Sequence, residues 1–399
     1  MPANGTAQPR LLIVLVLIMA AGPMVSYTAT VLGPLLTSEL RIDPAQFGLF
    51  ATASFVSATV FSRLLAGASD RLSVRVQLAT VFAFAALSFL ILAAARDLWW
   101  ALAAAIISGP AHALSNPLTN RVIATRVTKR LRARWMGIKQ SGVQCSQALA
   151  GLIVPVAAAL AGWRVSVMVL AVALLLLLLW SSSYLGRHAA PEGPTTPPRR
   201  SDDQPSFLPS APDGLVLRFA GYAMFSGAGL QATNVYLPLF AHEALGFSEV
   251  MAGLTVALAG TVGLSARIFW GQVMERGGDA ATLLLRLAAV AFGGVACLVL
   301  AQILAVHALL WVGVVLHGAT AIGSNVIIMA GAIREAPPSR AGATSATIAT
   351  GMYLGFASGP LAMSIPLSST GNFMYGWLLV AGCYACALLT ISSLGGRWR

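Results

Sequence analysis

The chain has 399 residues, of which 57% are hydrophobic and only 10% charged, and its mean hydropathy is +0.80. A soluble protein of this length could not bury so much apolar surface, so lipid must be the solvent for most of the chain. In hydrocarbon every backbone polar group needs an internal partner, which leaves helices or a closed barrel. Barrel strands alternate apolar and polar residues, and runs such as VSVMVLAVALLLLLLW do not. The composition therefore predicts an all-α integral membrane protein.

Twelve apolar segments are each close to the roughly 20 residues that cross a bilayer as a helix. We expect them at 11–36, 46–65, 77–95, 99–125, 136–162, 165–185, 215–240, 248–269, 281–303, 308–332, 342–366 and 374–394.

The longest hydrophilic break divides these segments into two sets of six. It runs from Gly186 to Gly214, is rich in Pro, Ser and charge, and cannot bury enough apolar surface to fold alone. We therefore expect an N-terminal six-helix bundle at 1–185, a cytoplasmic linker at 186–214 and a C-terminal six-helix bundle at 215–399.

The formal net charge of +12 is explained by the distribution of Lys and Arg along the chain. With the N-terminus inside, the outer loops hold only Arg41, Arg96 and Arg164 of the 25 basic residues. Basic residues concentrate in cytoplasmic loops of membrane proteins. The pattern predicts a multi-pass protein of the cell membrane with both termini in the cytoplasm, and the charge requires no nucleic-acid partner.

The two halves repeat a loop motif. A small residue precedes an acid–Arg pair by four positions in both: Ala66 before Asp70-Arg71, and Gly271 before Glu275-Arg276. Repeated halves with substrate bound between them are typical of secondary transporters. In the second half the segment 342–366 also carries glycines at every fourth position from 351 to 359, which predicts close helix packing, as a sliding interface between the halves would need.

The sequence DRLSVR at Asp70–Arg75 resembles the loop signature G-x-L-A-D-R-x-G-R-R of the major facilitator superfamily. Ala66 takes the place of the usual first Gly, and Ser73 stands where a second Gly is common. With the twelve spans, the resemblance covers the whole chain. It implies two pseudo-symmetric six-helix bundles that work by alternating access. NPLTNRVIA followed by GIKQSG resembles uncharacterised bacterial permeases more than sugar porters, so the subfamily stays unassigned and the membrane is expected to be a bacterial inner membrane.

The same resemblance implies a cytoplasmic gate. Asp70 would cap the span that begins near Ser339, because free N–H groups and the helix dipole favour a carboxylate there. Arg71 and Arg75 would pair with acids or lipid phosphates, and Glu275 with Arg276 would form the second copy. The alternative is a loop that only sets the topology.

Polar residues inside membrane spans are costly and therefore informative. Two stripes lie on single helix faces: His112, Asn116 and Asn120 at i, i+4 and i+8, and Gln140, Gln144 and Gln147 at i, i+4 and i+7. The candidate substrate-binding residues are Tyr27, His112, Asn116, Asn120, Arg121, Lys139, Gln140, Gln144, Gln231, Asn234 and His317. For each amide the alternative is a hydrogen bond between helices, and for His112 and His317 the choice is between such a bond and carrying a proton.

Arg121 and Lys139 bear on the substrate. Each lies a few residues inside the end of its span, so its side chain could either reach the headgroups or face a central cavity. None of the 13 acidic residues falls in the middle of a span. Cations in a low-dielectric cleft select anions, so we expect a transporter of a small, carboxylate-like organic anion.

Three alternatives remain open. A drug or metabolite efflux pump would use the same fold, although the absence of a carboxylate from the spans counts against proton-coupled cation export. A membrane sensor that binds without transport lacks support from any appended domain. An enzyme is disfavoured because the sequence has no P-loop, G-x-S-x-G or H-E-x-x-H motif.

The expected partners are the substrate and the lipid bilayer, with a proton or a counter-anion as the coupling species. We expect no cofactor and no metal, because the four cysteines lie in apolar spans as small hydrophobic residues. The protein is expected to be a monomer.

Overall fold

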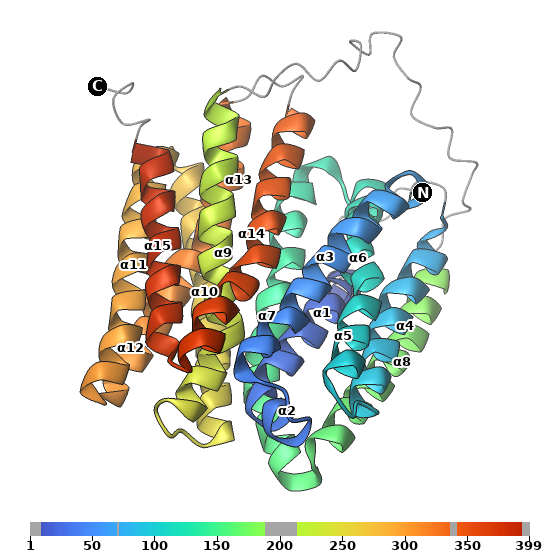
Figure 1. Cartoon of the computed structure of the whole chain (residues 1–399). Helices are drawn as coiled ribbons and strands as arrows, with labels where there is room; N and C mark the ends of the chain where they lie inside the picture. The colour runs from blue at the N-terminus through green and yellow to red at the C-terminus, as the bar shows by residue number, and fades with distance from the viewer. Residues whose placement is uncertain (1–8, 70–71, 188–213, 336–340, 393–399) are drawn as a thin grey trace.

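The computed structural model describes residues 9–69, 72–187, 214–335 and 341–392, and all regular structure within these ranges is helical (Figure 1). The helices are α1 (Pro9–Val31), α2 (Gly33–Glu39), α3 (Pro44–Ser69), α4 (Val74–Ala93), α5 (Leu98–Ile107), α6 (Gly109–Arg126), α7 (Lys129–Ala161), α8 (Trp163–Arg187), α9 (Gly214–Glu243), α10 (Glu249–Glu275), α11 (Ala280–Leu304), α12 (His307–His317), the π-helix η1 (Gly318–Ile322), α13 (Gly323–Glu335), α14 (Ala341–Thr370) and α15 (Phe373–Ser392).

Eleven helical stretches in the described part of the chain are long and apolar enough to span a membrane. The twelfth expected span is α9, a 30-residue helix. It is less apolar because protein, rather than lipid, surrounds it: the run from Gly227 to Ala241 is buried throughout. The buried side chains of Asn234, Tyr222 and Tyr236 of α9 find partners on neighbouring helices, so the helix needs no continuous apolar surface. The predicted all-α, twelve-helix fold is confirmed.

Two of the spans are interrupted helices. The fourth span consists of α5 and α6, and the chain turns between them at Ser108, where Pro110 in the first turn of α6 supplies no backbone N–H. The helix α6 continues through Pro117, and the interruption lies more than two turns earlier. The tenth span consists of α12, η1 and α13, so its middle is wound as a π-helix.

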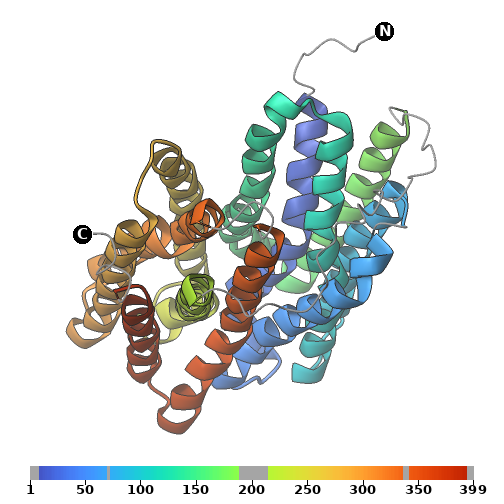
Figure 2. The same cartoon turned by 90° about the horizontal axis from the view of Figure 1, so that it is seen from above.

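The helices form two groups that lie beside one another, as Figures 1 and 2 show: the N-half, α1–α8 (blue to green), and the C-half, α9–α15 (yellow-green to red). Within the N-half, α1 packs against α7 and α4 against α8; within the C-half, α9 packs against α14 and α11 against α15. Contacts between the halves run chiefly through two pairs, α7 with α10 and α3 with α14. Residues of the expected linker from 188 to 213 lie outside the described residues.

We use two names for the ends of this bundle. The proximal end is where α1 begins and α15 ends, and the distal end is where α1 ends and α15 begins (Figure 1). The helix α7 runs from the proximal to the distal end and α10 runs the opposite way.

The glycines of α14 pack inside the C-half and not between the halves. A Cβ on Gly351, Gly355 or Gly359 would collide with backbone atoms of α9, among them the carbonyl oxygens of Ala220, Met224 and Ala228. The close packing predicted from the glycine spacing is therefore present, but its partner is α9. The inference that these glycines form a sliding interface between the halves was wrong, because sequence spacing reveals the small face of a helix but not the helix that covers it.

The interface between the halves is closed at the distal end. A Cβ on Gly260 of α10 would lie 2.7 Å from Ala148 N of α7, and a Cβ on Gly151 of α7 would collide with the backbone of α10. Toward the proximal end the same helices separate, because a Cβ on Gly137 of α7 would meet no described atom within 4 Å. On the other side of the interface, Thr52 Oγ1 of α3 donates to Ala357 O of α14 at 2.8 Å.

Candidate functional site

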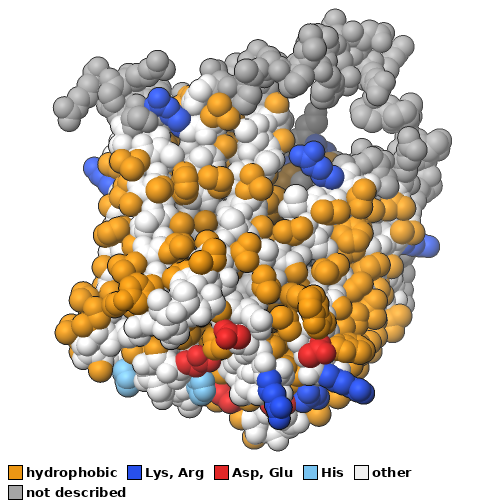
Figure 3. Space-filling view, in the orientation of Figure 1, with side chains coloured by type: hydrophobic (Ala, Val, Ile, Leu, Met, Phe, Trp, Pro, Cys, Tyr) orange, Lys and Arg blue, Asp and Glu red, His pale blue; other side chains and the backbone are white. Residues whose placement is uncertain are grey.

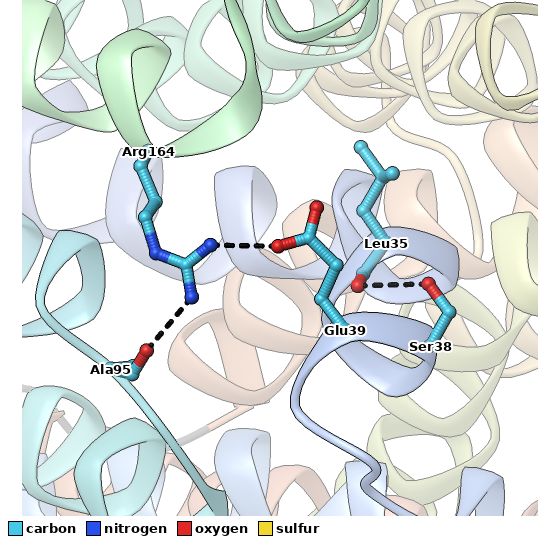
Figure 4. A network of polar contacts seen from close by, with 5 residues as sticks. All are labelled: Leu35, Ser38, Glu39, Ala95 and Arg164. Atoms are coloured by element: carbon cyan, nitrogen blue, oxygen red, sulfur yellow. Dashed lines mark hydrogen bonds and ion pairs between the residues drawn. The ribbon is translucent and has the colours of Figure 1, made fainter.

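The acidic side chains lie toward the two ends of the bundle. The described acidic residues all lie at helix ends or in connections: Glu39, Asp43, Asp97, Glu243, Glu249, Glu275, Asp279 and Glu335. On the face shown in Figure 3, the acidic side chains gather at the distal end. An exposed ion pair there joins Arg164 Nη1 to Glu39 Oε2 at 2.7 Å, and Arg164 Nη2 also donates to Ala95 O (Figure 4). This exposed pair joins α8 to α2 within the N-half and does not contribute to the interior of the bundle.

The ammonium of Lys139 is enclosed in the N-half. Lys139 Nζ donates to Asn120 Oδ1 at 2.5 Å, Thr119 Oγ1 at 2.7 Å and Asn116 Oδ1 at 3.2 Å, and the residue is 2% exposed. An ammonium has three N–H donors, and each of them has an acceptor here. The stripe of α6 thus meets the cation of α7, and Lys139 does not extend to the headgroups.

His112 lies on the same face of α6 but contacts a different partner. Its Nε2 is 3.3 Å from Ser26 Oγ of α1, and its ring is 5.9 Å from that of Phe55 of α3. The backbone of α6 at His112 also packs directly on Gly22 of α1, where a Cβ would lie 3.0 Å from His112 N. His112 therefore joins α6 to α1 and α3.

Arg121 is directed to the connection between α3 and α4. Its Nη1 donates to Leu72 O at 2.6 Å, and Gln77 Nε2 donates to the same oxygen at 3.1 Å. Ser73, which stands at a glycine position of the loop signature, caps α4 by accepting from Val76 N at 3.2 Å. The sequence grouped Arg121 with Lys139, but the structure gives the two cations separate partners.

Three amide and imidazole side chains meet between the halves. Asn234 Oδ1 of α9 accepts from Gln147 Nε2 of α7 at 3.2 Å and lies 3.1 Å from His317 Nε2 of α12. All three residues are buried. Gln144, one turn before Gln147, is also buried, and its Oε1 has no hydrogen-bond partner among the described residues. This group, the Asn234 cluster (Gln147, Asn234 and His317), is a polar contact between α7 and the C-half.

Two more predicted amides lie beside this cluster. Gln231, one turn before Asn234 on α9, is buried. Gln140 is half-buried on the α7 face that carries Gln144 and Gln147. Both remain candidates for substrate contact.

The π-helix follows His317 directly. A π-turn leaves backbone groups outside the regular helical pattern, and such turns are frequent at functional sites. Here Ala319 O accepts from Trp270 Nε1 of α10 at 2.9 Å, and Gly263 of α10 packs on Ile322. The π-helix η1 therefore packs on α10 and bonds to it beside the Asn234 cluster.

Sequence reasoning missed Arg267 of α10. It lies eight residues before the end of α10, which is about 12 Å at 1.5 Å per residue. Its Nε is buried with no hydrogen-bond partner in the described part of the chain, and its charge interacts with the half-buried Tyr27 of α1. The signal that could have found it is its spacing of seven residues from Gly260 and fourteen from Gly253.

The expected gate is described only in part. Asp70, Arg71 and the residues around Ser339 lie outside the described residues, so the cap between them stays a prediction. Arg75 is exposed at the proximal end, as are Glu275, the last residue of α10, and Arg276, which follows it.

The two helical halves pack against each other at one end and separate at the other, and polar groups are buried at their interface. This arrangement is typical of a secondary carrier. Residues 14–360 match the family model described as Major Facilitator Superfamily, and the chain belongs to this superfamily. It is a transporter by family and fold.

Solved structures agree with this assignment. A mutant of the nucleoside transporter NupG superposes with a TM-score of 0.76 at 14% identity, over 96% of this chain and 99% of that chain. A bacterial homolog of the human lysosomal transporter Spinster, in an inward-facing and occupied conformation, gives a TM-score of 0.68 at 15% identity, over 97% and 93%. At such identities the likeness establishes the fold alone. By sequence, no curated protein matches the chain.

Proposed function

We propose that this protein carries a small, carboxylate-like organic anion across the membrane by alternating access between the two halves. The main observation that supports an anionic substrate is the distribution of charged residues. Along the described spans Lys139 is buried and Arg267 is half-buried with its Nε enclosed, whereas every described Asp and Glu lies at a helix end or in a connection. In a cleft of low dielectric, unit charges attract far more strongly than in water, so buried cations favour an anionic ligand.

Further support comes from the arrangement of the helices. The halves are packed at the distal end and separated at the proximal end, as alternating access requires of one of its states. Since the basic residues predict a cytoplasmic proximal end, this state would be the one open to the cytoplasm. The Asn234 cluster crosses the closed part of the interface, and its bond between Gln147 and Asn234 must break when the distal end opens.

A neutral substrate is the second candidate. The solved structures of similar fold include a nucleoside transporter, and the buried amides of Gln147, Gln231 and Asn234 could hydrogen-bond an uncharged ligand. Neutral ligands do not need buried cations, so we favour the anion.

Uptake into proteoliposomes tests this proposal. Purified protein is given labelled succinate, lactate and benzoate, with uridine as the neutral compound and tetraphenylphosphonium as the cation. We expect saturable uptake of at least one carboxylate. Uptake of uridine or of the cation with no carboxylate taken up would overturn the anion assignment. Repeating the assay with a proton gradient, or with unlabelled anion inside the vesicles, separates proton coupling from exchange.

A further inference from the structure

One stripe of α10 faces α7. Gly253, Gly260 and Arg267 are spaced by seven residues and therefore lie on one face of the helix. A Cβ on Gly253 would collide with Pro155 of α7, and one on Gly260 would lie 3.1 Å from Gln144 O. The stripe has glycine at the two positions where α10 contacts α7. At its third position, where the two helices have separated, it has Arg267.

The neighbours of Arg267 fix the direction of its side chain. On one side of it, Ala266 is buried and Trp270 bonds to η1, so this side faces the C-half. On the other side, Ile268 and Phe269 are 59% and 56% exposed on the outer surface of the bundle. Arg267 therefore lies at the junction of the C-half and α7, which agrees with its interaction with Tyr27 of α1 in the N-half.

Among the described residues this half-buried guanidinium has no hydrogen-bond acceptor. Burying a charge costs several kcal/mol unless it is paired and hydrogen-bonded. Lys139 meets that need with three oxygens, whereas Arg267 has a buried Nε without an acceptor among the described residues. A guanidinium offers five donors in a planar fork that matches a carboxylate with two parallel bonds.

We propose that Arg267 and Tyr27 form the primary binding site for the carboxylate of the transported anion, an inference that rests on the proposed function. The guanidinium binds both carboxylate oxygens, and the Tyr27 hydroxyl donates to one of them. The two residues come from opposite halves, so a bound anion draws α1 and α10 together. Lys139 does not bind substrate in this arrangement, because its donors are already used by α6.

Binding to full-length protein in detergent, probed with succinate, lactate and benzoate, tests this site. In Arg267→Gln we expect the affinity for the carboxylate that binds wild type to fall by tenfold or more. Arg267→Lys should lose a similar factor because one ammonium cannot form the paired bonds, and Tyr27→Phe about threefold to tenfold, as for one hydrogen bond. The matched control is Arg286→Gln, an exposed arginine of α11, which should bind as wild type does.

Melting temperatures without ligand separate loss of the site from loss of the fold. Since the half-buried Arg267 has an enclosed Nε and no hydrogen-bond partner among the described residues, unliganded Arg267→Gln should melt at or above the temperature of wild type. A clearly lower melting temperature would show that the guanidinium is bonded within the protein, and would overturn the site. Carboxylate binding unchanged in Arg267→Gln would overturn the site and leave the anion function standing. Wild type that binds none of the carboxylates would overturn both.

Discussion

Lys139 and Arg267 are both cations inside membrane-spanning helices, and their surroundings give them different roles. The three donors of Lys139 are used by α6, so this residue joins α6 to α7. Arg267 lies at the interface of the halves, and the described part of the chain offers it no such acceptors. The sequence shows both residues as basic positions in apolar segments, and only the neighbouring helices distinguish them.

Lys139→Ala should destabilise the protein. It removes three charge-assisted hydrogen bonds and leaves the space of the four-carbon stem empty, so we expect a loss of about 2 kcal/mol or more. Lys139→Met keeps the stem and should lose less. The melting temperature in detergent measures both, with the exposed Arg75→Ala as the control, which should change stability by less than about 0.5 kcal/mol. If Lys139→Ala melted at the same temperature as wild type, the three hydrogen bonds of the Lys139 ammonium would not contribute to stability, contrary to this prediction.

Asp279 should give the start of α11 a dependence on pH. Its carboxylate caps the helix by accepting from Thr282 N at 2.9 Å, and bonds from Thr282 together with other amides lower its pKa. The cap is therefore complete above the ordinary pKa of Asp and is lost as the pH falls through the lowered value. We expect exchange of the Thr282 amide hydrogen to increase in that acid range. In Asp279→Asn this increase should vanish, and the Ser248 cap of α10 is the untitrated control; an equal increase at both caps would count against the prediction.

At the scale of elements, glycine decides where the helices of the two halves touch. The α7–α10 contact places backbone against backbone at Gly151 and Gly260, and the glycines of α14 do the same against α9 within the C-half. Small residues permit this approach in lipid, where packing rather than the hydrophobic effect holds helices together. The positions of close contact could be predicted from spacing, whereas the pairing of helices could not.

Gly260→Ala should weaken closure of the distal end. The new Cβ would lie 2.7 Å from Ala148 N, so α10 must move away from α7. Spin labels at Ser38→Cys and Ser369→Cys, exposed distal positions in the two halves, should report longer distances once the four native cysteines are replaced. Gly137→Ala is the matched control on α7, because its Cβ would meet no described atom within 4 Å. Equal distance distributions in both variants would show that the contact is not tight.

At the scale of the whole molecule, two halves with few contacts at one end can rock about the packed end. The direction of this opening relative to the cell depends on the topology, which the distribution of Lys and Arg predicts. In agreement with this distribution, five of the described acids lie at the distal end: Glu39, Asp43, Asp97, Glu243 and Glu249.

We expect the proximal end to face the cytoplasm. In intact cells with a cysteine-free background, a membrane-impermeant thiol reagent should label Ser38→Cys at the distal end and leave Ser392→Cys at the proximal end unlabelled. Opening the membrane should expose Ser392→Cys to the reagent. The opposite pattern would reverse the topology and, with it, the assignment of the open side.

The sequence by itself determined that lipid surrounds the chain, that twelve helices cross the membrane and that the loop at Asp70–Arg75 belongs to a transporter family, because hydropathy and motif spacing are local properties. It also identified Asn116, Asn120, Asn234 and His317 as polar positions inside the spans. Only the tertiary structure decided that the asparagines of α6 bond to Lys139, that Asn234 meets α7 and α12, and that Arg267 has no bonded partner among the described residues. A polar side chain in a membrane span needs a hydrogen-bond partner, and that partner lies on another helix. Which helices pack together is a tertiary property that the local sequence of neither helix specifies.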